Sequence, residues 1–339
     1  TSVFRIIMRK ALRSIRKKGY NLKHILLVGY SRAAEEYIDR ILSNPQWGYV
    51  VCGILDEHIP GGTTYKGVKV LGTLGNLEYI LPENKLDEIA ITLSLKDYDY
   101  LEGLESFQEG LFAVQDISSM FVGELADPKA GDHVIDVCAA PGGKSLHVAE
   151  KLQLADEAAA RENGTEEKAG RVEARDLTEY KTDLIWQNID RTGLGNICAV
   201  CKDASVFDKY DEEAADLVIA DLPCSGLGVL GKKPDLKYRV QPEDLEELAD
   251  LQRKILTCVQ AIVKEGGTLL YSTCTVNPGE NIENVHWFLK EYPQFELDDI
   301  TENICKELKS DVIEKGCIQF FPGVHDCDGF FIARFKKKA

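Results

Sequence analysis

Two cysteines lie in short segments that could carry chemistry, "DLPCSGLG" around Cys224 and "YSTCTVNPGEN" around Cys274. Each segment follows an apolar run that is typical of a buried strand and precedes a turn rich in Gly or Pro. If neighbouring parallel strands carry them, both thiols face one cleft beside the carboxylate of Asp221. Taken alone, Cys274 could be a buried thiol, a metal ligand or a nucleophile, because thiols serve in all three ways.

A third segment, "VIDVCAAPGGKS", is typical of a strand that turns into a helix. Glycines at such a turn let the backbone approach a ligand, and the helix N-terminus offers unpaired N–H groups. The spacing does not fit the phosphate loop G-x-x-x-x-G-K-[ST], because Cys138 stands where its first glycine is needed. The candidate ligand-binding residues of this segment are Cys138, Ala139, Ala140, Pro141, Gly142, Gly143 and Lys144.

Acidic residues end three further strand-like runs: Asp176 after "VEAR", Asp203 after "VCK" and Asp221 after "LVIA". Ligands of open parallel sheets bind at the carboxyl ends of the strands, so these carboxylates would line one site. They suit ribose hydroxyls, an exocyclic amine and a cationic ligand, and they would repel a triphosphate in the absence of a metal ion. S-adenosylmethionine carries a sulfonium and an amino group, so it fits this ring of acids better than ATP does.

Two cysteines and an acid beside a methyl donor suggest methyl transfer to a poorly nucleophilic carbon. Carbon 5 of a pyrimidine is such an atom. A thiolate that adds to carbon 6 makes carbon 5 enamine-like, so that it can attack the methyl group.

The elements that position these residues alternate between strand and helix from about residue 103 onward, which predicts a mostly parallel sheet. A long helix is predicted over residues 241–267, ended by Gly266 and Gly267. The polar residues 153–170 predict a mobile surface loop. The last segment, "CIQFFPGVHDCDGFFIARFKK", predicts a closing antiparallel hairpin.

Residues 1–102 predict a smaller βαβ domain. The loop after its first strand is a degraded G-x-G-x-x-G in which Ser31 and Ala34 follow Gly29, and Asp56 stands where a ribose-binding acid is expected. A Rossmann-like domain without a bound nucleotide is equally compatible with this loop. The expected elements are a strand at 24–30, a helix at 33–44, strands at 49–57 and 68–72, and then a helix and a strand at 86–94.

This first segment resembles the Rossmann-like domain of polyprenyl-phosphate sugar-phosphate transferases, on "ILLVGYSRAAEEYIDRILSNPQWGYVVCGILDE" and "GVKVLGTLGNLEYI". The resemblance implies an alternative function, a non-catalytic regulatory module that binds a nucleotide or nucleotide sugar through residues 24–102. The sequence contains neither the membrane helices nor the transferase domain of that family, so no sugar-transfer chemistry is implied.

From about residue 103 to 338 the chain resembles a second family. "DVCAAPGGK", "DLPCSGLG" and "YSTCTVNPGEN" resemble motifs of RNA 5-methylcytosine methyltransferases, and "FFPGVHDCDGFFIARF" resembles the C-terminal end of bacterial 16S rRNA cytosine-5 methyltransferases of the B type. The resemblance implies a Rossmann-like S-adenosylmethionine-dependent methyltransferase domain over 103–339, preceded by the smaller α/β domain over 1–102. Family members carry an RNA-binding region at that place, so the chain is a natural fusion, an engineered fusion or a misjoined sequence, and we favour the last two together over the first.

The resemblance also implies roles for individual residues. Cys274 would attack carbon 6 of a cytosine in RNA, and the resemblance to the B-type enzymes implies 16S rRNA. Cys224 would assist release of the methylated RNA. Asp221 would bind the cytosine edge. S-adenosylmethionine would be bound by Asp221, Asp176, Asp203 and the segment 138–144. The target base would have to be unstacked, because carbon 6 is inaccessible within a stack.

Composition sets the remaining expectations for this chain of 339 residues, which is long enough for two domains. No apolar run reaches the roughly 20 residues that a membrane helix needs. The net charge of −16 argues against simple electrostatic capture of nucleic acid, although residues 1–24 hold eight Lys or Arg and no acid.

Ten cysteines, mostly in apolar runs, favour reduced thiols in a cytoplasm, and the lone pair Cys198 and Cys201 predicts no metal site. Because the chain begins at Thr1, we expect a fragment or processed product.

Overall fold

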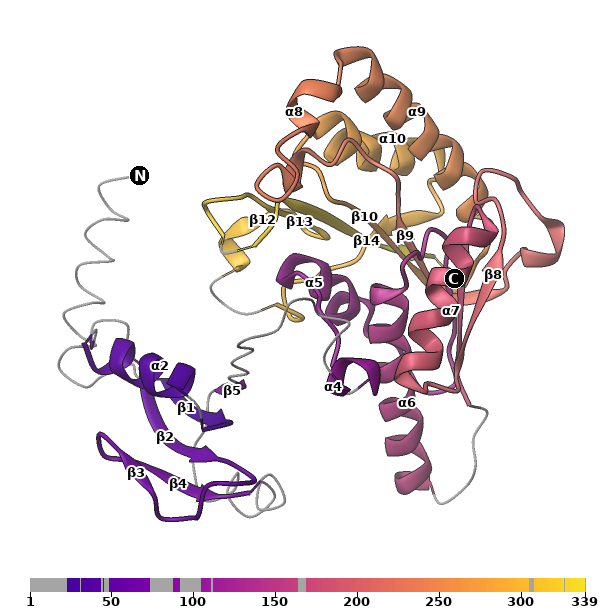
Figure 1. Ribbon diagram of the computed structural model, residues 1–339. Helices are drawn as coiled ribbons and strands as arrows, with labels where there is room; N and C mark the ends of the chain where they lie inside the picture. The colour runs from indigo at the N-terminus through magenta and orange to yellow at the C-terminus, as the bar shows by residue number, and fades with distance from the viewer. Residues whose placement is uncertain are drawn as a thin grey trace. The chain divides into compact units, whose positions relative to one another are not determined.

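The computed structural model describes residues 23–30, 32–43, 45, 49–73, 88–91, 105–110, 112–163, 169–304, 308–325 and 327–338. The chain divides into two compact units, residues 1–99 and 100–339, and each has its own hydrophobic core (Figure 1). Most of the predicted basic stretch, Ser31 and the helix predicted before residue 86 lie outside the described residues.

The first unit is a small α/β domain with the strand order β3-β4-β2-β1-β5, parallel except for the pair β3 and β4. Its core packs Ala34, Ile38 and Ile41 of the helix against the apolar strands, because these residues recur on one helix face. The elements are β1 (Lys23–Val28), α2 (Arg32–Ser43), β2 (Tyr49–Leu55), β3 (Thr64–Tyr65), β4 (Val68–Gly72) and β5 (Glu88–Ile91).

The second unit begins with helices α4 (Glu105–Gln108) and α5 (Ile117–Ala126) and continues as alternating strands and helices. Its helices are α6 (Gly143–Asn163), α7 (Glu179–Thr192), α8 (Leu236–Arg239), α9 (Pro242–Val259) and α10 (Ile282–Glu291). Its 3-10 turns are η4 (Lys209–Asp211), η5 (Leu227–Val229), η6 (Pro278–Glu280) and η7 (Lys309–Asp311). Its strands are β6 (His133–Asp136), β7 (Arg171–Asp176), β8 (Ile197–Cys201), β9 (Ala215–Asp221), β10 (Val263–Thr273), β11 (Phe295–Leu297), β12 (Val312–Glu314), β13 (Cys317–Phe320) and β14 (Phe330–Lys337).

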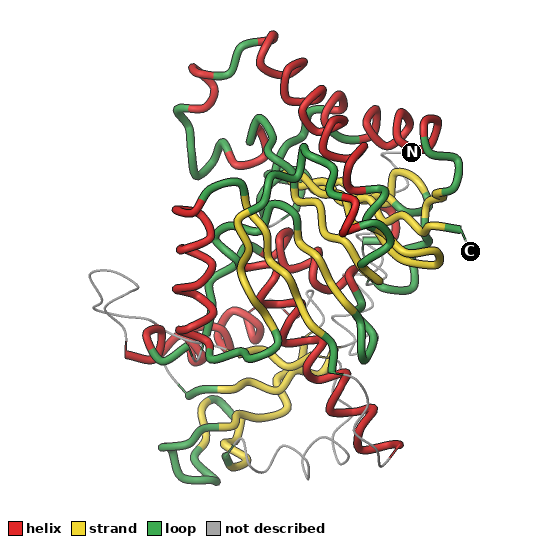
Figure 2. The backbone as a smooth tube through the Cα atoms, turned by 90° about the vertical axis from the view of Figure 1, so that its right-hand side faces the viewer, coloured by secondary structure: helices red, strands yellow, loops and turns green. Residues whose placement is uncertain are grey.

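The nine strands of this unit form one sheet in the order β12-β13-β14-β10-β9-β6-β7-β8, with β11 paired to β14. The strands from β10 to β8 are parallel, and β12, β13 and β14 add antiparallel pairs that include the predicted closing hairpin. Helices cover both faces of the sheet, α5, α6 and α7 on one and α9 and α10 on the other (Figures 1 and 2). This three-layer arrangement confirms the predicted methyltransferase-type α/β fold preceded by a smaller α/β domain.

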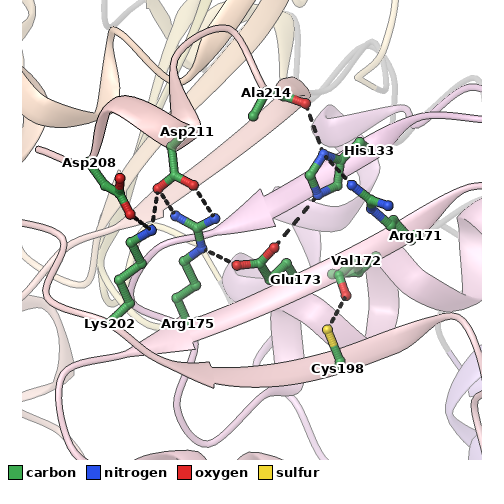
Figure 3. A network of polar contacts seen from close by, with 10 residues as sticks. All are labelled: His133, Arg171, Val172, Glu173, Arg175, Cys198, Lys202, Asp208, Asp211 and Ala214. Atoms are coloured by element: carbon green, nitrogen blue, oxygen red, sulfur yellow. Dashed lines mark hydrogen bonds and ion pairs between the residues drawn. The ribbon is translucent and has the colours of Figure 1, made fainter.

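A largely buried ion-pair network lies beside β7, the strand next to the edge strand β8 (Figure 3). The guanidinium of Arg175 donates to Glu173 and to both carboxylate oxygens of Asp211, at 2.5 to 3.0 Å. Lys202 adds a second cation beside Asp211 at 2.7 Å. A bidentate arginine–carboxylate pair fixes geometry in two directions, so it ties β7 to the segment that leads into β9.

The predicted helix over 241–267 is wrong at its C-terminal end. Helix α9 stops at Val259, and Val263 begins strand β10, paired with Ala215 of β9. The apolar run that ends in Ile262 and Val263 suits a helix or a strand equally well, and the tertiary pairing with β9 decides the outcome.

The predicted mobile loop over 153–170 is wrong for residues 153–163, which continue helix α6. Ala, Leu, Glu and Arg dominate this part, and all four are strong helix formers. Asp156 accepts the N–H groups of Gly131 and Gly170 at 2.7 and 2.8 Å, which ties the helix to the segments before β6 and β7. Among the described residues, no helix is both long and apolar enough to cross a membrane.

Candidate active site

The strand order reverses direction between β6 and β9, and the residues singled out in the sequence gather at this point. From β6 the chain proceeds outward through β7 and β8, then returns to place β9 on the opposite side of β6. Open parallel sheets bind ligands in the crevice outside the carboxyl ends of the strands at such a reversal. Asp136, Asp176 and Asp221 are the last residues of β6, β7 and β9, and the two candidate cysteines follow the ends of β9 and β10.

The turn after β6 brings the backbone close to helix α7. Gly142 has φ +106°, a conformation that L side chains rarely adopt, and Ile185 lies against the position that a Cβ would take. Asn188 donates to the carbonyl of Pro141 at 3.0 Å, which holds the turn to α7. A Cβ built on Gly143, the first residue of α6, would meet no atom within 4 Å, so space is open beside the helix N-terminus.

Two carboxylates at strand ends form hydrogen bonds with this turn and the first residues of α6. Asp136 is 1% exposed and accepts the Ser145 hydroxyl at 2.6 Å. Burial raises the pKa of Asp136 to about 7, although the hydrogen bond from Ser145 opposes the shift. Asp176 accepts the Ala140 N–H at 3.0 Å and pairs with Lys181 at 2.9 Å.

Asp203, the third predicted acid, has a different environment from Asp136 and Asp176. Its exposed carboxylate accepts the Ser205 N–H at 2.8 Å, so its described partner lies in its own turn after β8. Backbone and hydroxyl hydrogen bonds from Ser205 lower the pKa of Asp203. Contact between Asp203 and a cofactor therefore stays a prediction.

Lys144 and Asp221 form an ion pair that joins the turn after β6 to the end of β9. Their Nζ and Oδ2 atoms are 2.7 Å apart, and both side chains are largely buried. Ser272 of β10 donates its hydroxyl to Asp221 at 2.7 Å. Burial acts to lower the pKa of Lys144, but the charge and hydrogen bond of Asp221, together with the charge of Asp136, outweigh it and the net shift is upward. Lys144 therefore keeps its positive charge, and the pair as a whole is neutral.

The two candidate cysteines are in contact. Their sulfur atoms are 3.2 Å apart, because β9 and β10 are parallel neighbours and Cys224 and Cys274 follow their ends. The hydrogen bond from Cys224 lowers the pKa of the Cys274 thiol, and the ammonium of Lys144 adds to the effect, while burial and Asp221 oppose it. The same hydrogen bond, together with burial, raises the pKa of Cys224. The contact itself allows either sulfur to donate, and the opposite pKa shifts favour Cys274 as the thiolate and Cys224 as its donor.

The sequence did not reveal how these thiols are held. Ser225 and Thr275 follow the two cysteines directly, and their hydroxyl oxygens are 2.8 Å apart. Glu280 is fully buried and accepts both the N–H and the hydroxyl of Ser225. The only sequence signal was the shared pattern of a cysteine followed by a hydroxyl residue, "PCS" and "TCT".

The other sequence candidates take part in local contacts. Asp56 accepts the N–H groups of Tyr30, His58 and Ile59 at 2.7 to 2.8 Å, so its carboxylate connects the loops after β1 and β2. Cys198 and Cys201 point to backbone carbonyl oxygens of β7 and the residue after it. Within the described ranges, no group of three or more His, Cys, Asp or Glu could hold a metal ion.

The residues of the crevice fit S-adenosylmethionine. Asp176 ends β7, where a carboxylate can accept ribose hydroxyls, and its partner Lys181 is half-exposed, so it can move aside. The small side chains of Ala139 and Ala140 and the open space at Gly143 leave the backbone accessible. The carboxylate of Asp221 lies at the same crevice, where Lys144 balances its charge.

Comparison with known proteins agrees with this geometry. Residues 124–336 match the family model described as 16S rRNA methyltransferase RsmB/F, and residues 2–105 match a model described as a CoA-binding domain, which fits the smaller α/β domain expected there. The chain is 40% identical over 239 residues to the probable ribosomal RNA small subunit methyltransferase B of Bacillus subtilis, covering 70% of this chain and 50% of that protein. It is 33% identical over 234 residues to ribosomal RNA small subunit methyltransferase F of Escherichia coli, covering 67% and 45%.

Solved structures show the same fold. NSun6 from Pyrococcus horikoshii, crystallised with SFG, has 26% sequence identity and a TM-score of 0.57, covering 84% of this chain and 67% of that one. A methyltransferase homologue from Pyrococcus horikoshii has 25% identity and a TM-score of 0.55, covering 71% and 73%. The chain spans about half the length of the curated relatives that it matches. S-adenosylmethionine is the cofactor, and the crevice fits it. Because the family model covers more than half of the sequence, the chain belongs to the 16S rRNA methyltransferase RsmB/F family.

Proposed function

We propose that residues 103–339 transfer a methyl group from S-adenosylmethionine to carbon 5 of a cytosine in RNA, and that 16S rRNA is the substrate. The observation that carries the proposal is the contact between Cys224 and Cys274 beside the Lys144–Asp221 ion pair. The curated relatives are named as ribosomal RNA methyltransferases, which supports RNA as the substrate class.

Cys274 acts as the nucleophile in this proposal. The thiolate is the reactive form of cysteine, and the hydrogen bond from Cys224 with the charge of Lys144 favours it by lowering the pKa. Its sulfur forms a bond to carbon 6 of the cytosine ring, and the electron pair of the 5,6 double bond moves onto carbon 5, where it is delocalised toward carbon 4 and nitrogen 3. Carbon 5 thereby becomes nucleophilic.

Asp221 and Lys144 orient the reacting groups. Asp221 accepts hydrogen bonds, so it suits the exocyclic amine at the cytosine edge, while Lys144 and Ser272 fix the position of its carboxylate. S-adenosylmethionine would supply an electrophilic methyl group beside carbon 5. Asp176, Asp203 and residues 138–144 are proposed to hold it.

Cys224 completes the reaction. After methyl transfer, carbon 5 carries both a methyl group and a hydrogen. Removal of that hydrogen as a proton restores the 5,6 double bond and expels the Cys274 thiolate. Cys224 is the group in contact with Cys274 that can take the proton, once its own proton has passed to solvent or to the RNA.

Substitution of each cysteine tests the proposal with S-adenosylmethionine and unmethylated 16S rRNA transcript. Cys274→Ala should abolish both methylation and the covalent RNA adduct, because the nucleophile is lost. Cys224→Ala should accumulate an adduct that survives denaturing electrophoresis, because release is blocked. Cys198→Ala, which changes an exposed cysteine in β8, serves as the control and should behave as the unmodified chain.

Two outcomes would contradict the proposal. An adduct that forms with Cys274→Ala but not with Cys224→Ala would reverse the two roles. Absence of any thermal stabilisation of the chain by saturating S-adenosylmethionine would exclude methyl-donor binding.

A further inference from the structure

A buried carboxylate lies next to the cysteine pair and has no part in the chemistry described above. Glu280 is 0% exposed and lies in η6, after β10. Burial of an ionised carboxylate costs free energy unless hydrogen bonds or a cation compensate it. In the described part of the chain, no basic side chain forms an ion pair with it.

Hydrogen-bond donors surround Glu280 instead. Oε2 accepts the Ser225 N–H at 2.8 Å and the Gln252 side-chain amide at 3.1 Å. Oε1 accepts the Ser225 hydroxyl at 2.5 Å and the Asn277 side-chain amide at 3.1 Å. All four partners donate, and the two oxygen atoms of a carboxylate can accept four hydrogen bonds.

The direction of the hydrogen bonds around Ser225 follows from this arrangement. A hydroxyl group has one hydrogen, and Ser225 uses it toward Glu280. The contact of 2.8 Å between Ser225 and Thr275 must therefore be donated by Thr275. Thr275 Oγ1 in turn accepts the Asn277 N–H at 3.2 Å. One ordered series of hydrogen bonds thus runs from the loop after β10 to the loop after β9 and ends at Glu280.

This series connects the residues that directly follow the two cysteines. We propose that Glu280 is a positioning residue, which holds the loop of Cys224 against the loop of Cys274 so that the two sulfur atoms stay in contact. Its use in catalysis rests on the proposed function, but the positioning itself does not. The Gln252 amide also donates to the carbonyl of Pro223, immediately before Cys224, so the same network holds both sides of that cysteine.

Glu280→Gln tests the proposal because glutamine keeps the shape and removes one acceptor. In either orientation, its NH2 group faces two of the four donors. Two hydrogen bonds are then lost and the loops separate. The Glu283→Gln variant makes the same chemical change at an exposed position in the first turn of α10, so it is a matched control.

The readout is the rate at which the oxidant diamide closes a Cys224–Cys274 disulfide in the full chain, followed by peptide mass spectrometry. Diamide takes up the two electrons and two protons that the thiols release when the S–S bond forms. Bond formation needs the sulfurs to approach from 3.2 Å to about 2.05 Å, so the rate reports their positioning. This measurement needs neither RNA nor S-adenosylmethionine, so it is independent of methyl transfer.

Glu280→Gln should slow disulfide closure about tenfold, while the Kd for S-adenosylmethionine stays within about twofold. Glu283→Gln should close at the rate of the unmodified chain. If Glu280→Gln fails to fold, Thr275→Val provides the test, because it removes the hydroxyl that donates to Ser225 and should also slow closure. Closure at the unmodified rate in the folded variant would overturn the positioning role, whether or not the chain methylates RNA.

Discussion

Lys144 places a positive charge beside Asp221, and this charge also acts on the thiol of Cys274. The sequence marked it as a possible contact for a cofactor, at the end of "APGGK". In the structure it pairs with Asp221, lies over the ring of Phe330 with its Nζ 5.3 Å from the ring centroid, and acts on the Cys274 thiol. The ion pair therefore links the turn that faces the cofactor to the nucleophile.

Lys144→Met should raise the pKa of Cys274. The variant removes a positive charge that favours the thiolate and leaves the negative charge of Asp221, which disfavours it. The pH midpoint for alkylation of Cys274 by iodoacetamide should therefore move upward by about one unit. Lys151→Met is the control on the same helix, because Lys151 pairs with Glu124. An unchanged midpoint in Lys144→Met would show that its charge does not reach the thiol.

The sequence predicted residue types at this scale better than residue partners. Cys224, Cys274 and Asp221 could be found because strand-end positions in a parallel sheet converge on one edge. The hydrogen bonds of Glu280 could not be found, because Ser225 is 55 residues away and no spacing rule links them. Asp203 fits the same strand-end pattern as Asp176, yet its described hydrogen bond stays within its own turn.

At the scale of elements, the site depends on the close approach of three loops. The N–H of Gly228 donates to the carbonyl of Cys274 at 3.1 Å, and the N–H of Gly329 donates to the carbonyl of Gly228 at 2.9 Å. The loops after β9 and β10 and the segment before β14 thus meet backbone to backbone. Such contact leaves no room for a Cβ, which explains glycine at both positions.

Gly228→Ala should destabilise the second unit by about 1–3 kcal/mol, because the added methyl group would overlap the carbonyl oxygens of Gly329 and Cys274. The urea midpoint, followed by tryptophan fluorescence, measures the effect. Gly231→Ala is the matched control, because a Cβ there meets no atom within 4 Å. Equal midpoints for the two variants would show that the three loops can separate at little cost.

Helix and strand types could be predicted from the sequence, but some ends could not. Helix α7 has local signals for both of its ends, because Thr178 caps its N-terminus and Gly193 its C-terminus. The end of α9 depends on β10, which takes up Val263 through its pairing with Ala215. A local pattern holds no information about that pairing.

At the scale of the whole molecule, the chain combines two units of different character. Residues 1–102 hold 14 basic and 12 acidic side chains, whereas residues 103–339 hold 26 basic and 44 acidic ones. The second unit therefore repels a polyanion at long range, and RNA must be bound through local contacts. We propose that residues 1–102 and 103–339 are separate domains, because each unit buries its own apolar core.

Separate domains should respond separately to S-adenosylmethionine. The residues predicted to bind S-adenosylmethionine all lie in the second unit, so a concentration of about 100 times the Kd should raise its unfolding temperature by roughly 5–10 °C. The first unit should unfold at an unchanged temperature, since linkage stabilises only the cooperative unit that binds. Hydrogen exchange followed by mass spectrometry during a temperature series distinguishes the two, because peptides from β1 and β2 report the first unit and peptides from β9 and β10 the second. A common shift in both sets of peptides would mean that the two units unfold together. A shift confined to the peptides of β1 and β2 would mean that S-adenosylmethionine binds the first unit, and would contradict the proposed site.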